Sequence, residues 1–220
     1  GAGPAGLELT RALGQRGYDV TLCDADETLG GRLRFEAKLP GLATWQRVAD
    51  HRLLQIGKMA NVQVLRGSPV SVDDALAFGA SAIYVATGSR WRVDGLGRTH
   101  RQAIVADAAT HVLSPDAALR GAAAQGPLVI YDDDHYYMGG VMAELLVKQG
   151  CAVTLVTPSI RVSDWSYNTL EQGFIQKRLI ELGVEIQVTR GLTRIGQDHV
   201  ETACVYSDRR AETACDAVVL

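Results

Sequence analysis

The apolar positions of the chain alternate between helical stripes and short continuous runs, a pattern typical of α/β proteins. A stripe that includes Leu7, Leu9 and Leu13 predicts a helix ending at Gly17, and the apolar run 18–23 predicts a buried strand. Further predicted helices and strands cover residues 45–59, 62–65, 81–86, 168–182 and 184–188.

Between and after these elements the pattern is less regular. Residues 91–126 are rich in loop-forming residues, with a possible domain junction near Ser114-Pro115. Residues 128–156 give strand, turn, helix and strand in sequence, and short strands and turns are expected after residue 188. The resulting prediction is a chain built largely from strand–helix–strand units.

An internal repeat links the first of these units to the second. RGYDVTLCDA matches QGCAVTLVTP when Gly17 is placed on Gly150, a shift of 150 − 17 = 133 positions. The predicted fold is therefore α/β, with two Rossmann-like units of FAD/NAD(P)-binding type and parallel sheets. We expect residues 1–113 and 212–220 to form the first unit, and the degenerate second unit, 114–211, to be inserted into it.

The chain opens on a glycine fingerprint, GAGPAG, which comprises Gly1 to Gly6 with Pro4 and Ala5 between the last two glycines. Gly1 permits a tight turn, Gly3 lets backbone approach a pyrophosphate closely, and Gly6 lets the following helix pack on a sheet. Such a fingerprint needs a strand before it, so we expect a strand ahead of Gly1. Asp24 ends the next strand, where an acid binds ribose hydroxyls and disfavours a 2′-phosphate.

Two further segments are candidates for the same site. Gly31 and Arg32 lie in LGGR, where Arg32 either approaches the phosphates as a planar donor or is a solvated arginine after a plain turn. Thr87 and Gly88 follow the run 81–86 and form either a small-residue loop crossing the nucleotide or an ordinary strand-end turn. The cofactor-binding candidates are therefore Gly1, Gly3, Pro4, Ala5, Gly6, Asp24, Gly31, Arg32, Thr87 and Gly88.

The repeated unit carries the wrong residues for the same ligand. The shift of 133 places Gly3 on Tyr136 and Gly6 on Gly139, and the preceding residues are Asp132, Asp133 and Asp134. A phenol blocks the approach of a phosphate, and carboxylates repel it. The hypothesis is that this half keeps the fold but does not bind NAD(P)H. We expect one aspartate to cap the following helix rather than the three to hold a metal.

Composition and charge limit the possible partners. The formal net charge is −3 and the isoelectric point about 6.0, so a nucleic-acid partner is not expected. Apolar runs are too short for a membrane span. The four cysteines are scattered with no C-x-x-C, so no metal site is predicted, and unpaired cysteines fit a cytoplasmic location.

Taken together, several segments resemble one known family. GAGPAGLE, LGGR, LPGL-x-x-W, VATGS-x-W, YDDDHYYMGG and VTP-x-x-x-V-S-x-W are similar to the C-terminal half of the trimethylamine, dimethylamine and histamine dehydrogenases. The resemblance covers essentially the whole chain. YDDDHYYMGG and ATGSRWR are its most specific parts, because generic flavoproteins with two dinucleotide domains carry a second glycine fingerprint there.

The resemblance implies a flavin-dependent amine dehydrogenase whose other part holds covalent FMN and a [4Fe-4S] centre, with electrons passing to an electron-transfer flavoprotein. It implies ADP or FAD in the first unit, a homodimer when full length, and no catalytic residue within these 220 residues. Alternatives are an FAD/NADPH reductase of the 2,4-dienoyl-CoA or disulfide-reductase type, a non-catalytic adenine-nucleotide-binding module, and a demethylase of N-methylated amino acids in the same family.

Overall fold

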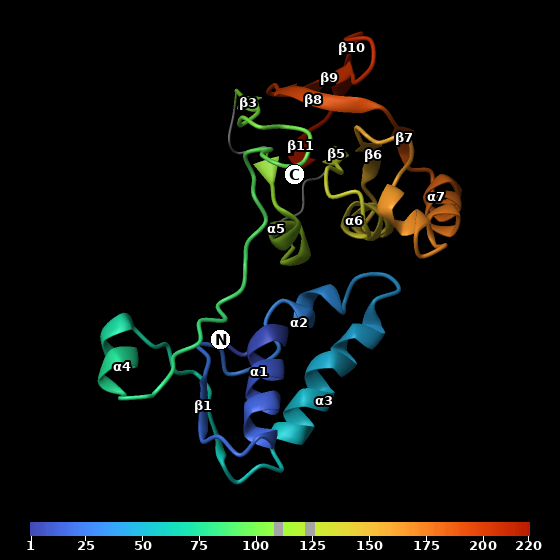
Figure 1. The fold of residues 1–220 in the computed structure, drawn as a ribbon. Helices are drawn as coiled ribbons and strands as arrows, with labels where there is room; N and C mark the ends of the chain where they lie inside the picture. Colours follow the sequence, from blue (N-terminus) through green and yellow to red (C-terminus); the bar gives the residue numbers. More distant parts are fainter. Residues whose placement is uncertain (108–111, 122–125) are drawn as a thin grey trace. The chain divides into compact units, whose positions relative to one another are not determined.

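The computed structural model describes residues 1–107, 112–121 and 126–220, which form two compact units, Gly1–Ser89 and Arg90–Leu220 (Figure 1). Parts of the predicted loop-rich stretch, 108–111 and 122–125, lie outside the described residues. Throughout the described ranges, no helix combines the length and apolar character needed to cross a membrane. The predicted α/β fold with parallel sheets is confirmed.

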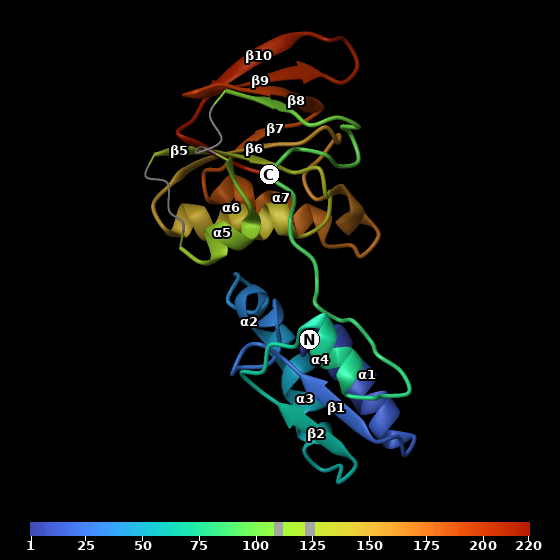
Figure 2. The same cartoon turned by 90° about the vertical axis from the view of Figure 1, so that its left-hand side faces the viewer.

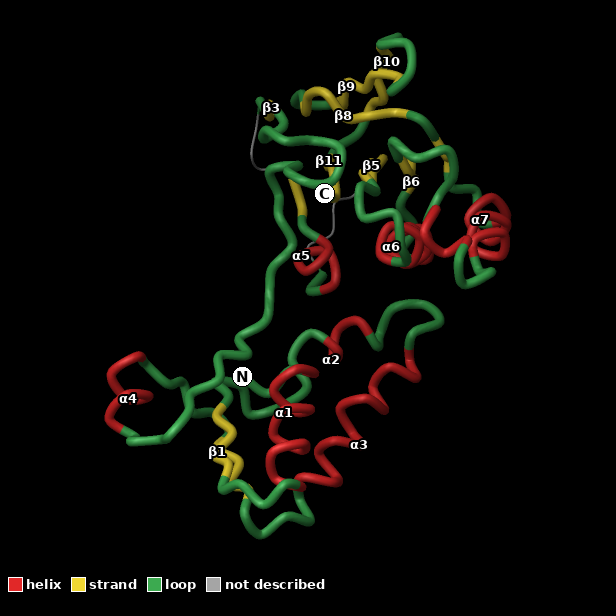
Figure 3. Tube along the Cα trace, viewed as in Figure 1, coloured by secondary structure: helices red, strands yellow, loops and turns green. Residues whose placement is uncertain are grey.

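The first unit contains a parallel pair of strands and the helices that pack beside it. Its elements are α1 Pro4–Gln15, β1 Val20–Cys23, α2 Leu33–Glu36, η1 Ala43–Trp45, α3 Gln46–Ile56, β2 Val62–Leu65 and α4 Val72–Ala77. β1 pairs with β2 in register from Val20 opposite Val62, and α1 lies against α3 (Figure 3). The core between them is built from Ala2, Leu7, Leu22, Leu29, Leu33, Ala49 and Ile56.

The second unit is larger and holds two sheets. Its elements are β3 Val105–Ala106, β4 Val112–Leu113, α5 Pro115–Leu119, β5 Pro127–Tyr131, α6 Met138–Lys148, β6 Ala152–Val156, η3 Asp164–Tyr167, α7 Gln172–Glu181, β7 Glu185–Gln187, β8 Arg190–Ile195, β9 His199–Cys204, β10 Arg210–Ala214 and β11 Ala217–Val219. One sheet has the order β4-β11-β5-β6-β7 and is parallel. The other has the order β10-β9-β8-β3, in which β8, β9 and β10 form an antiparallel meander.

The parallel sheet of the second unit is covered on both faces, as parallel sheets require. Figure 2 shows the meander on one face and helices α6 and α7 on the other. β5 is accordingly buried from Leu128 to Tyr131. Val129 and Val218 of the sheet pack with Leu192 and Val200 of the meander in one core. This packing fixes the carboxyl end of β5, and it therefore also fixes where the aspartates that follow β5 begin.

The last strand is a correction to the sequence analysis. Residues 214–220 were expected to return to the first sheet, but β11 pairs in parallel with both β4 and β5 of the second unit. The hydroxyl of Ser114 accepts a hydrogen bond from the N–H of Ala117 and caps α5. The boundary between the two compact units falls between Ser89 and Arg90 and not at the predicted residues 113 and 211.

The predicted buried strand 81–86 is also wrong. The segment belongs to no helix or sheet, and Val85 is 82% exposed. The repeat explains this, because a shift of 133 places Val85 on Val218 of β11 (85 + 133 = 218), whose partner is β5. Among the described residues of the first unit the sheet consists of β1 and β2, so the segment has no neighbouring strand to pair with.

Candidate functional site

In the turn that carries the glycine fingerprint, two positions are packed so closely that only glycine fits. A Cβ on Gly1 would lie 2.2 Å from the carbonyl oxygen of Ala86, and a Cβ on Gly6 would lie 1.8 Å from the carbonyl oxygen of Gly1. Both distances are far below van der Waals contact. Gly1 and Gly6 are therefore required by the packing of the turn itself, whether or not a ligand is present.

Gly3 differs from the other two glycines. It precedes α1 in an ordinary extended conformation, with φ −74° and ψ −174°, and Pro4 occupies the first helical position. A Cβ built on Gly3 would meet nothing within 4 Å. No atom of the first unit therefore requires a glycine at this position. The space beside Gly3 is open to a ligand.

A second loop crosses in front of the same turn. The N–H of Gly30 donates to the carbonyl of Ala2 at 2.9 Å. A Cβ on Gly31, where φ is +54°, would lie 3.0 Å from the Cα of Gly3. The LGGR segment thus lies against the fingerprint.

Asp24 joins the end of β1 to this turn. Its carboxylate accepts a hydrogen bond from the N–H of Ala2 at 2.5 Å and from that of Asp26 at 2.8 Å. This anchoring role was not anticipated from the sequence, which indicated only a ribose ligand. The two roles are compatible, because each carboxylate oxygen accepts more than one hydrogen bond.

Arg32 lies beside the third loop of the site. One terminal nitrogen of its guanidinium donates to the carbonyl oxygen of Ser89 at 2.5 Å, directly after Thr87 and Gly88. Gly88 has φ +81°, a conformation that favours glycine. Arg32 is therefore held beside the cradle, the site formed by the glycine fingerprint, Asp24, the Gly31-Arg32 loop and the Thr87-Gly88 loop, rather than extended into solvent. Its planar guanidinium carries further N–H donors.

The sequence-predicted residues of the first unit are thus brought together. The fingerprint, Asp24, the Gly31-Arg32 loop and the Thr87-Gly88 loop converge at the start of α1. The first N–H groups of a helix have no partner inside the helix, and its dipole is positive at that end. Such an arrangement suits a phosphate group. Arg32 lies beside the turn, and Asp24 lies at the end of the next strand, where an acid binds ribose in this type of fold.

In the second unit, Asp132 occupies the start of the corresponding helix. It is 3% exposed, and its Oδ1 accepts a hydrogen bond from the N–H of His135 at 2.9 Å. A Cβ on Gly139 would lie 2.8 Å from the Cβ and Cγ of Asp132, so the one retained glycine makes room for this side chain. A carboxylate from the protein itself therefore packs against the start of α6.

Asp133 holds a loop over the same end of the sheet. Its carboxylate accepts hydrogen bonds from the N–H of Thr99 at 3.0 Å and from the Thr99 hydroxyl at 2.5 Å. A Cβ on Gly97 would lie 2.2 Å from Asp133 Oδ2. His100 completes the loop, with its Nε2 3.1 Å from the hydroxyl of Tyr131. Sequence reasoning missed this loop, since nothing in the spacing of residues 95–100 indicates contact with the aspartates.

The aspartates and His135 change one another's pKa values. Burial raises the pKa of Asp132 to about 6, although His135 opposes the shift. Burial would lower the pKa of His135, but the carboxylates of Asp133 and Asp132 outweigh it, and the pKa is raised above its usual value. The pKa of Asp133 is lowered despite its burial, because His135 and Thr99 stabilise the ionised form.

Tyr136, Tyr137 and Thr157 also bear on the predictions for the second unit. The expected aspartate cap is wrong, because α6 has no side-chain cap and its N-cap residue is Tyr137. Tyr136, at the position of Gly3, is 40% exposed and packs edge to face with Tyr137. Thr157, at the position of Asp24, donates its hydroxyl to the carbonyl of Asp132 at 2.9 Å and so braces the loop.

Comparison with known proteins matches a family model to part of each unit. A model of the NAD(P)-binding Rossmann-like domain matches residues 1–56, and a model of the OYE-like second alpha/beta domain matches residues 113–215. Dimethylamine dehydrogenase from Hyphomicrobium sp. (strain x) is 36% identical over 216 residues, which are 94% of this chain and 29% of that protein.

Two solved structures agree over the whole chain. Histamine dehydrogenase from Rhizobium sp. 4-9 is 50% identical, with a TM-score of 0.96, covering 100% of this chain and 34% of that one. 6-Hydroxypseudooxynicotine amine oxidase from Pseudomonas geniculata N1 is 42% identical, with a TM-score of 0.97, covering 100% and 33%. The chain spans about a third of the length of these relatives. It belongs to the trimethylamine, dimethylamine and histamine dehydrogenase family, as a region homologous to that third.

Proposed function

We propose that the first unit binds an adenine nucleotide, ADP or FAD, as the nucleotide-binding part of a flavin-dependent amine dehydrogenase. The observation that carries the proposal is Gly3. It is the fingerprint glycine that the packing of the protein does not require, because a Cβ there meets nothing within 4 Å. Its absence of a side chain is explained by a ligand whose phosphates approach the backbone closely.

Each residue of the cradle then has a separate task. The N–H groups at the start of α1 and the guanidinium of Arg32 bind the pyrophosphate, while Gly31 and Gly3 keep side chains out of its path. Asp24 orients the ribose and disfavours a 2′-phosphate by its charge. Thr87 and Gly88 form the small-residue loop beside it. Bound FAD would supply electron transfer, whereas ADP would supply only structure.

The wider protein is proposed on the same homology. Relatives of this chain are named as amine dehydrogenases and an amine oxidase, so an amine is the proposed substrate class. FMN and a [4Fe-4S] centre in another part of the protein, an electron-transfer flavoprotein as acceptor, a homodimer and a cytoplasmic location complete the proposal. The 220 residues themselves are assigned cofactor-binding residues and no catalytic one.

The second unit is proposed not to bind NAD(P)H. Asp132 lies at the start of α6, Asp133 holds Thr99 over the same end of the sheet, and Tyr136 replaces the glycine that must approach phosphate. Each feature works against an anion. This arrangement favours the amine dehydrogenase over an FAD/NADPH reductase, which needs a second working cradle.

The nucleotide carried by the purified protein tests the proposal. The protein is denatured, and the released small molecules are identified by mass spectrometry and absorbance. We expect ADP or FAD in an amount close to one per chain. ADP without FAD would assign the cradle a structural role, and FAD a redox role. Release of neither, together with no uptake of either when they are added, would contradict the proposal.

A further inference from the structure

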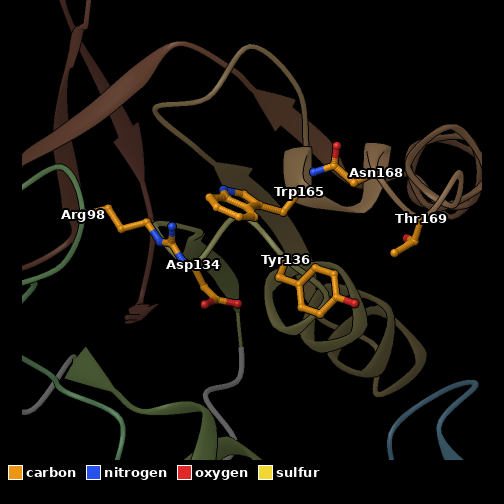
Figure 4. Close-up of a pocket in the computed structure, with 6 residues that line it drawn as sticks. All are labelled: Arg98, Asp134, Tyr136, Trp165, Asn168 and Thr169. Carbon is orange, nitrogen blue, oxygen red and sulfur yellow. The ribbon is translucent and has the colours of Figure 1, made fainter.

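A separate cavity of about 330 Å³ lies on the second unit. Figure 4 shows its lining, which is Arg98, Asp134, Tyr136, Trp165, Asn168 and Thr169. These residues come from the loop before β3, from the loop between β5 and α6, and from η3 and the turn after it. None of them belongs to the cradle of the first unit, and no nucleotide is needed to explain them.

The walls of this cavity are held in place by the backbone. The N–H of Trp165 donates to the carbonyl of His135 at 2.8 Å, which ties the aspartate loop to η3. Three residues at the ends of these segments, His135, Ser163 and Leu170, have φ values of 62°, 50° and 63°. A non-glycine residue in this region stores strain that the surrounding structure must compensate. His135 lies between Asp134 and Tyr136 in the chain, so its backbone conformation sets the directions of both side chains.

Two opposite charges share the cavity without pairing. The guanidinium carbon of Arg98 lies 4.8 Å from the ring centroid of Trp165, so the charge is held over the indole face. Asp134 is partly buried and has, within the described part of the chain, no hydrogen-bond or ion-pair partner. No ion pair joins Arg98 to Asp134, although both line one space (Figure 4). Each charge is therefore available to a ligand.

The aromatic lining adds a second kind of contact. Trp165 is 51% exposed and Tyr136 is 40% exposed, and both face the cavity that they line. Aromatic faces attract organic cations more strongly when part of their water is displaced. The side-chain amide of Asn168 and the hydroxyl of Thr169 supply neutral hydrogen-bonding groups at the rim.

We propose that this cavity binds a small zwitterionic amine, an ammonium and a carboxylate on one short carbon frame. The ammonium lies against Asp134 and the ring of Tyr136, and the carboxylate accepts hydrogen bonds from the fork of Arg98. An unpaired anion is repelled by Asp134 and an unpaired cation by Arg98, so a ligand that carries both charges is favoured over either alone. Binding here is independent of the nucleotide proposed for the first unit.

Isothermal titration of the 220-residue chain tests this with three probes. N,N-Dimethylglycine carries both charges, dimethylamine carries only the cation, and acetate only the anion. We expect saturable binding of N,N-dimethylglycine, with affinity at least about tenfold higher than for either of the other two. Saturation-transfer NMR on the same samples reports which ligand protons lie against the aromatic rings.

Matched variants locate the binding. Asp134→Asn keeps the shape of the side chain and Arg98→Gln keeps a polar side chain, and each removes one charge. Each variant is expected to bind N,N-dimethylglycine about tenfold or more weakly. Neither side chain makes a hydrogen bond within the described residues, so both variants are expected to stay folded, which circular dichroism checks. Arg101→Gln and Asp73→Asn make the same charge changes at exposed positions outside the cavity and are expected to bind normally. No saturable binding of the zwitterion, equal binding of dimethylamine, or unchanged affinity in both cavity variants would overturn the proposal.

Discussion

Gly6→Ala is expected to destabilise the first unit by about 3 kcal/mol or more. The added methyl group would lie 1.8 Å from the carbonyl oxygen of Gly1, which is backbone and cannot rotate away. In an unhindered helix the same change stabilises, since alanine is the better helix former by about 1 kcal/mol. A lower free energy of unfolding in Gly6→Ala would therefore report the steric contact at the turn and not a change in helix propensity. The free energy of unfolding in urea, with hydrogen exchange of α1 and β1 amides, checks the result.

Gly3→Ala is the matched control for that experiment, because a Cβ at Gly3 meets nothing within 4 Å. It is expected to change the free energy of unfolding by less than about 1 kcal/mol, the ordinary difference between glycine and alanine at a helix N-cap. If Gly6→Ala and Gly3→Ala unfold at the same urea concentration as the wild type, the close packing of the turn is contradicted.

Asp132→Asn is expected to make the second unit more stable at neutral pH and to reduce its dependence on pH. The pKa of Asp132 rises on folding from 3.8 to about 6 because of burial. A raised carboxyl pKa means that the folded state binds the proton more tightly. The associated stability is therefore present below about pH 4, is lost as pH rises to 6, and stays lost above it.

The size of this effect follows from the shift. Two pKa units correspond to about 3 kcal/mol, of which on the order of 2 kcal/mol lies between pH 4 and pH 8. Asparagine keeps the oxygen that accepts from the His135 N–H but carries no proton to lose. The difference in unfolding free energy between variant and wild type should thus grow with pH across this window. His135 and Asp134 also act on Asp132, and Asp133 and Arg98 act on His135, so the comparison is made between variants and not between absolute profiles. A difference that is constant with pH would refute the assigned role of burial.

The local parts of the fold could be predicted from the sequence. The shared Val-Thr-Leu of the repeat correctly placed β1 and β6, and the glycine fingerprint correctly placed the start of α1. These features depend on residues close together in the chain. The approach of Asp24 and the LGGR loop to the fingerprint was also predictable, since both follow β1 and the strands of a parallel sheet end at one edge.

Pairings between distant segments could not be predicted. The run 81–86 and β11 have similar apolar composition, and only their neighbours in the sheet decide that one is exposed and the other buried. The contact between Thr99 and Asp133 spans 34 residues and leaves no periodic signal. The anchoring of Ala2 by Asp24 was missed for another reason, because an acid at the end of this strand predicted only a contact with ribose.

The two units therefore share a strand–turn–helix arrangement but differ at the turn before the helix. The first unit leaves the space before its helix open and surrounds it with N–H groups and Arg32. The second fills that end of the sheet with Asp132 and the loop held by Asp133. We propose that an adenine nucleotide binds to the first unit and not to the second.

Calorimetric titration of ADP into nucleotide-free protein tests that claim most directly, with variants that exchange the residues at one equivalent position. Gly3→Tyr places in the first cradle the residue found in the second, and Tyr136→Gly does the reverse. We expect one ADP site per chain, loss of that site in Gly3→Tyr with the fold retained, and a single unchanged site in Tyr136→Gly. Full ADP binding by Gly3→Tyr, or binding lost in Tyr136→Gly, would contradict it.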